Sequence, residues 1–218
     1  MQKKTFSVKE MVLIAMLAAI AYVIVALVRI PVVLFLKYEP KDVIITIGGF
    51  LMGPLAAFVT SLVVSLVEMV TISDTGPIGA LMNLLSTCSF ACTAALIYKK
   101  RHTLSGAILG LLLGSVVMVA AMLLWNWLIT PLYLGVARSV VEGMLVPAFL
   151  PFNLLKAGLN SALVLVLYKP LVTALRKAKL VPSQVKSSGK GNKTGAMILG
   201  LILLATCILL LLVFQGKI

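Results

Sequence analysis

Charged side chains are scarce in this chain of 218 residues, at 11% of the total, whereas hydrophobic residues make up 61%. Its mean hydropathy is +1.16. A soluble domain of ordinary composition carries charge on about a quarter of its residues, and this chain also contains apolar runs of membrane-spanning length. The composition therefore excludes a water-soluble globular fold and predicts an all-α integral membrane protein.

Residues for metal and acid–base chemistry are also few. The chain has one histidine, three cysteines and six acidic residues. His102 lies in a basic loop, and Cys88 and Cys92 have no second ligand pair nearby. Hydrolytic metal chemistry, a histidine-based triad and a disulfide framework thus lack support, and the dispersed acids argue against a membrane-embedded enzyme acting on lipids or isoprenoids. We expect neither catalytic residues nor a metal site.

A nucleotide-binding loop is missing as well. The segment 189–195 superficially resembles a phosphate-binding loop, but Asn192 stands where that motif needs glycine, and no strand precedes it. We therefore expect no ATPase site in this chain. Active transport would draw on an ion gradient or on separate ATPase subunits.

Seven apolar segments organise the chain. They are residues 11–28, 43–60, 61–72, 78–98, 104–127, 145–168 and 196–214. The second and third are separated only by small and polar residues. Before the last lies a stretch rich in Lys, Ser and Gly without hydrophobic periodicity, which is typical of a flexible linker. The sequence thus predicts a six-helix membrane domain over 1–175, a basic cytoplasmic linker over 176–194 and an additional transmembrane segment over 195–218.

Basic residues outnumber acidic ones by 19 to 6, and their distribution predicts the orientation. With the N-terminus in the cytoplasm, thirteen basic residues fall on the inner side: Lys3, Lys4, Lys9, Lys99, Lys100, Arg101, Lys169, Arg176, Lys177, Lys179, Lys186, Lys190 and Lys193. Five fall on the outer side: Arg29, Lys37, Lys41, Arg138 and Lys217. This positive-inside pattern predicts a multi-pass protein of the cell membrane with a cytoplasmic N-terminus. It also explains the basic excess without nucleic acid, for which no basic and aromatic patch exists.

Polar residues inside the predicted spans are candidates for a binding site. Asn153, Lys156 and Asn160 share one helical face at spacings i, i+3 and i+7, in the outer half of the sixth span. The fifth span brings Trp125 and Asn126 to the same depth. Amides, an ammonium and an indole would suit a small polar and aromatic ligand arriving from outside. Alternatively, these polar groups pair with one another, and the indole belongs to the interfacial belt.

Glu68 is the other charge within a predicted span. A buried carboxylate can couple ion movement, so an ion-gradient-driven secondary carrier would need Glu68. Its position near the end of the span favours a solvated or lysine-paired structural role, and no inverted repeat is apparent.

Small residues recur at helix-packing spacing. Gly110 and Gly114 lie four residues apart, which indicates close packing within the protein, as do Ala15 and Ala19 on the first span. For the two alanines, docking onto another membrane protein is a serious alternative.

Several separated motifs, in order along the chain, resemble the riboflavin-specific substrate-binding (S) components of energy-coupling factor (ECF) transporters, the RibU type. The motifs are residues 37–42, 48–54, 74–79 with Asn83, 125–126 and 147–160. The resemblance covers about residues 8–182. The apolar segment at the C-terminus departs from the six-span pattern.

This resemblance implies a six-helix bundle that captures riboflavin at the extracellular face and joins a transmembrane coupling subunit and two cytoplasmic ATPases. Riboflavin would be cargo, so no cofactor is expected. The ligand-contacting residues implied are Asn126, Asn153, Lys156 and Glu39, with Leu36 and Trp125 covering the ring system. Ala15 and Ala19 would dock the partner. An S component for another vitamin or for a flavin nucleotide is the related alternative.

Overall fold

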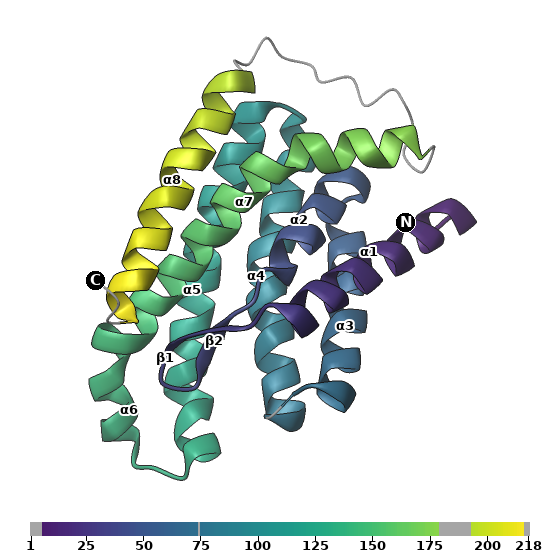
Figure 1. The fold of residues 1–218 in the computed structure, drawn as a ribbon. Coiled ribbons are helices and arrows are strands. Elements are labelled where there is room, and N and C mark those ends of the chain that lie inside the picture. The colour runs from purple at the N-terminus through teal and green to yellow at the C-terminus, as the bar shows by residue number, and fades with distance from the viewer. Residues whose placement is uncertain (1–5, 74, 179–192, 216–218) are drawn as a thin grey trace.

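The structure, a computed structural model, describes residues 6–73, 75–178 and 193–215. Its long helices are α1 (Val8–Leu27), α3 (Pro54–Thr71), α4 (Gly76–Arg101), α5 (Leu104–Leu134), α7 (Leu150–Lys177) and α8 (Lys193–Phe214). Shorter elements are β1 (Ile30–Val33), β2 (Leu36–Tyr38), α2 (Lys41–Met52), α6 (Arg138–Met144) and the π-helix η1 (Leu145–Phe149). Figure 1 shows the helices gathered into one bundle. The predicted all-α bundle with an added C-terminal helix is thereby confirmed.

Within the described residues, six helices are long and apolar enough to cross a membrane: α1, α3, α4, α5, the continuous stretch Arg138–Leu175 and α8. The second predicted span, by contrast, is the short α2. Twelve residues rise about 18 Å, less than the roughly 30 Å of a bilayer core.

The predicted boundary between the second and third spans, near Thr60, is wrong. The chain breaks at Gly53, whose φ is 100°, and α3 begins at Pro54. Glycine tolerates this left-handed conformation, and proline, which lacks an N–H, suits the first position of a helix. Thr60 lies inside α3, where its hydroxyl donates to the carbonyl of Ala56.

A small antiparallel hairpin precedes the short helix α2 in the chain. Strand β1 pairs with β2, with Ile30 opposite Tyr38 and Val33 opposite Leu36. In Figure 1 the hairpin lies in the lower half with α6, whereas the C-terminal end of α7 and the start of α8 lie at the top. The hairpin and the basic end of α7 are therefore at opposite ends of the bundle.

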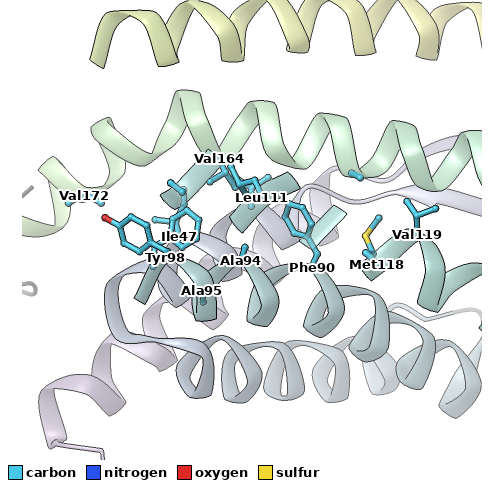
Figure 2. Packing of buried hydrophobic residues seen from close by; sticks show 14 of the residues in the cluster. Ile47, Phe90, Ala94, Ala95, Tyr98, Leu111, Met118, Val119, Val164 and Val172 are labelled. Atoms are coloured by element: carbon cyan, nitrogen blue, oxygen red, sulfur yellow. The ribbon is translucent and has the colours of Figure 1, made fainter. Parts of the chain in front are cut away.

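The main core lies where α4 meets α5 and α7. A Cβ added at Gly110 would lie 2.7 Å from the carbonyl oxygen of Ala94, and one at Gly114 would lie 2.6 Å from that of Phe90. The two backbones therefore touch, which confirms close internal packing for this glycine row. Figure 2 shows Phe90, Leu111 and other apolar side chains of this core interdigitating.

Helix α7 extends through Lys177, and α8 returns along it from Lys193. Residues 179–192 of the predicted linker lie outside the described residues. The predicted division into a domain of 1–175, a linker of 176–194 and a C-terminal segment of 195–218 stays a prediction.

Candidate functional site

A cavity of about 190 Å³ opens at the hairpin end of the bundle. Residues from the hairpin, from the loop before α4 and from α4, α5 and α7 line it: Arg29, Phe35, Leu36, Lys37, Glu39, Ser73, Thr75, Met82, Asn83, Ser86, Met122, Asn126, Tyr133, Phe152, Asn153 and Lys156. Leu36, Glu39, Asn126, Asn153 and Lys156, which the sequence indicated as ligand contacts, thus converge on one space.

Trp125 lies outside the lining of this cavity. It lines a smaller neighbouring space of about 20 Å³, together with Ile78, Ile129 and Thr130. One residue along an α-helix turns the side chain by about 100°. Because Asn126 faces the cavity, its neighbour Trp125 must face elsewhere.

The two cavity asparagines are held by their own helices. Asn126 Nδ2 donates to the carbonyl of Met122 at 2.7 Å, and Asn126 Oδ1 accepts from the Thr130 hydroxyl at 2.9 Å. Asn153 Nδ2 donates to the carbonyl of Phe149 at 2.8 Å. The π-helix η1 ends at that phenylalanine, and such one-turn irregularities are frequent at functional sites. Both amides are thereby oriented before any ligand binds.

Lys156 is held by a buried polar network on the α2 side. Its Nζ donates to Ser86 Oγ at 3.1 Å and pairs with Asp42 Oδ2 at 3.3 Å. Asp42, which is fully buried, also accepts from Thr87 Oγ1 at 2.6 Å and from Asn160 Nδ2 at 3.2 Å. This pairing confirms that Lys156 and Asn160 share a face, and it shows that Asn160 supports the site from behind.

Tyr38 of the hairpin adds a further hydrogen bond to this network. Its hydroxyl donates to Asn160 Oδ1 at 3.0 Å. Burial, together with the nearby negative charge of Asp42, raises the pKa of Tyr38 well above its ordinary value. The phenol therefore stays protonated and remains a donor.

A second network surrounds Lys41. Its Nζ pairs with Glu39 Oε2 at 2.9 Å and with Glu68 Oε2. Arg29 Nε donates to Glu39 Oε1 at 3.0 Å, and Asn83 Nδ2 donates to Glu68 Oε2 at 3.1 Å. Lysine pairing of Glu68, one of the two structural roles expected for it, is therefore correct, and the solvated role is not.

Glu39 is the acid that lines the cavity, and three neighbouring cations set its ionisation. Burial raises its pKa, but the charges of Lys41, Lys156 and Arg29 outweigh that effect and hold the pKa below its ordinary value. Glu39 is thus an ionised acceptor at neutral pH, facing the cavity.

Lys41 and Asp42 are the functional residues that sequence reasoning missed. The sequence places Lys41 among the outer basic residues, but its side chain is only 1% exposed. The missed signal is Lys41-Asp42 at the start of an apolar helix, where charges need buried partners. The described residues contain no group of three or more His, Cys, Asp or Glu arranged to hold a metal ion.

Ala15 and Ala19 lie on a different surface from the cavity. Both are exposed on α1, whereas Leu13, Leu17 and Ala18 of the same helix are buried. The two alanines therefore do not pack against the described part of this chain. They form a strip of small side chains on the outside of the bundle.

Comparisons with known proteins place this bundle in a class. The family model "ECF transporter, substrate-specific component" matches residues 9–168, so the chain belongs to this family of membrane transport proteins. It is similar to "Riboflavin transporter RibU" of Staphylococcus aureus (strain TCH60), with 29% identity over 78% of this chain and 93% of the relative. It is also similar to "Riboflavin transporter FmnP" of Bacillus subtilis (strain 168), with 27% identity over 79% and 98%.

A solved structure has the same fold. It is described as "Structure and mechanism of the S component of a bacterial ECF transporter", and it matches with a TM-score of 0.66 and 29% identity. The match covers 77% of this chain and 98% of the solved one. The S-component bundle expected from the sequence is thus confirmed.

Proposed function

We propose that this protein is the riboflavin-binding S component of an ECF uptake transporter. It captures riboflavin from outside and releases it inward when joined to a transmembrane coupling subunit and two ATPase subunits, and it has no ATPase site of its own. The convergence of Leu36, Glu39, Asn126, Asn153 and Lys156 on one cavity carries this proposal. The two riboflavin transporters among its relatives support the choice of ligand.

The cavity has the chemistry that a flavin needs. Phe35, Phe152 and Met82 supply apolar surface for a flat ring. The fixed amides of Asn126 and Asn153 can read the polar edge of that ring. An ammonium has three donors, and two of those on Lys156 go to Ser86 and Asp42, so the third can reach a ligand oxygen. Riboflavin is cargo here, and no cofactor is required.

Charge balance favours the neutral vitamin over a phosphorylated flavin. Arg29 and Lys41 pair with Glu39, and Lys156 pairs with Asp42. At Arg29, Lys41 or Lys156 a phosphate would therefore have to compete with an existing ion pair, at the cost of leaving a carboxylate unpaired. We expect flavin mononucleotide to bind more weakly than riboflavin.

The geometry around Glu68 disfavours a self-sufficient ion-driven carrier. A coupling carboxylate has to exchange its proton or cation with solvent during transport. Glu68 is instead 1% exposed and held by Lys41 and Asn83. It serves as a structural partner of Lys41.

Titration of riboflavin into purified, ligand-free protein tests the proposal. Flavin fluorescence should be quenched saturably at one ligand per chain, and flavin mononucleotide should need a higher concentration. Asn153→Ala should weaken binding by about ten- to hundred-fold, since a buried hydrogen bond is lost. The control is Leu154→Ala, which alters an exposed side chain on the same turn. Absence of quenching in a folded, ligand-free sample would refute the riboflavin assignment.

The partner site we propose is the strip of Ala15 and Ala19, with the N-terminus of α1 in the cytoplasm of a bacterial cell and the bundle in its plasma membrane. Small exposed side chains let a second helix approach closely. Ala19→Leu should therefore reduce co-purification with the coupling subunit and leave riboflavin binding unchanged. Ala205→Leu is the control, because it makes the same exchange at an exposed position of α8, away from the strip. Undiminished co-purification of Ala19→Leu would exclude this strip as the docking site.

A further inference from the structure

Helix α8 lies beyond the part of the chain that the family shares. The family match ends at residue 168. The curated relatives and the solved structure are matched over 93% to 98% of their own lengths by only 77% to 79% of this chain. We propose that α8 holds the β1–β2 hairpin over the cavity and thereby slows exchange of the bound ligand. The ligand part of this inference rests on the proposed function.

Two glycines allow α8 to pack closely against α7. A Cβ added at Gly158 of α7 would lie 2.7 Å from Cys207 Sγ of α8. A Cβ added at Gly200 of α8 would lie 3.1 Å from Val166 Cγ2 of α7. The helices can approach this closely only without those side chains, so α8 has a defined position on the bundle.

The C-terminal half of α8 reaches the hairpin. Cys207 and Leu211 are buried in one cluster with Val32 of β1 and Leu36 of β2. Just past the helix, Gln215 Nε2 donates to the carbonyl of Pro31 at 2.9 Å. Figure 1 shows the lower end of α8 beside β1.

This contact bears on the cavity because the hairpin is one of its walls. Phe35, Leu36 and Lys37 all line the cavity, and Leu36 also belongs to the cluster that α8 completes. A two-stranded hairpin is marginally stable by itself, so its opening is governed by what packs against it. Removing the contacts of α8 should let the hairpin open more often and expose the ligand.

Two substitutions, one on α8 and one just past its end, test this without touching the cavity lining. Leu211→Ala removes a buried contact to the hairpin cluster, and Gln215→Ala removes the bond to Pro31. In the full-length protein we expect faster amide hydrogen exchange over residues 30–38 without ligand, and riboflavin dissociation on the order of ten-fold faster in the double variant. Leu209→Ala is the matched control, since Leu209 of the same helix is 57% exposed, and it should change neither rate.

A second pair of variants tests the packing of α8 against α7. Gly200→Leu should push α8 from α7 and accelerate both rates, whereas Ala205→Leu places the same leucine side chain at an exposed position of α8 and should not. Unchanged hairpin exchange in Leu211→Ala, Gln215→Ala and Gly200→Leu would overturn the holding role. Faster hairpin exchange with unchanged riboflavin dissociation would overturn the retention role. If neither the wild-type protein nor any variant binds riboflavin, the proposed function is refuted. Hydrogen exchange over residues 30–38 would still decide whether α8 holds the hairpin.

Discussion

Replacing Lys156 with Met should abolish measurable riboflavin binding and destabilise the protein. The ammonium is the only cation paired with Asp42 among the described residues, and Asp42 is fully buried. Breaking a buried ion pair by removing one partner costs about 3–5 kcal/mol, because the remaining charge stays desolvated. We expect a large fall in the thermal unfolding midpoint in detergent and a loss of affinity of at least about a hundred-fold.

The double variant Lys156→Met, Asp42→Asn separates the two roles of the lysine. Removing both charges leaves an amide that Thr87 and Asn160 can still contact, so most of the stability should return. Riboflavin binding should not return, because the ligand donor is still missing. Lys169→Met on the exposed end of α7 is the control. If the double variant binds riboflavin as well as wild type, Lys156 acts only through Asp42 and is not a ligand contact.

Lys41→Met should be far more damaging than Glu68→Gln, although both remove a charge from the same pair. Without Lys41, Glu68 loses its paired cation and Glu39 keeps only Arg29, and about 3–5 kcal/mol of stability should be lost. Without the charge of Glu68, Lys41 keeps Glu39 at 2.9 Å. Oε1 of Glu68 already has no hydrogen-bond partner among the described residues, so an amide there costs only about 1 kcal/mol.

Thermal unfolding with and without riboflavin measures this asymmetry. Glu68→Gln should unfold near the wild-type temperature and retain riboflavin binding. Lys41→Met should unfold much earlier, and adding Glu68→Gln to it should recover part of the loss, since one unpaired carboxylate is then removed. Loss of riboflavin uptake in a stable Glu68→Gln variant, assayed in cells with the complete transporter, would revive the ion-coupled mechanism.

The helical part of the candidate site was predictable, because helix periodicity fixes which side chains share a face, whereas Leu36 and Glu39 came only from the family resemblance. Asn153, Lys156 and Asn160 needed only the spacing of one helix. Trp125 shows where such reasoning stops, because its adjacency to Asn126 says nothing about which of them faces the cavity. The burial of Lys41 and Asp42 was not predicted, for a different reason. Their partners are remote in sequence, so only the packed bundle shows that these charges are buried and not solvated.

The sequence alone determined the solvent, the helical class, the polar face of α7 and the family resemblance, since these depend on composition, local periodicity and short motifs. It did not determine that α2 ends at Met52, just before Gly53, because both sides of that break are equally apolar. Only the tertiary structure decided that three cations and three carboxylates pair with one another in and beside the cavity wall and that α8 rests on α7 and reaches the hairpin. Those facts depend on contacts between segments far apart in the chain, whose geometry hydrophobic patterns do not encode.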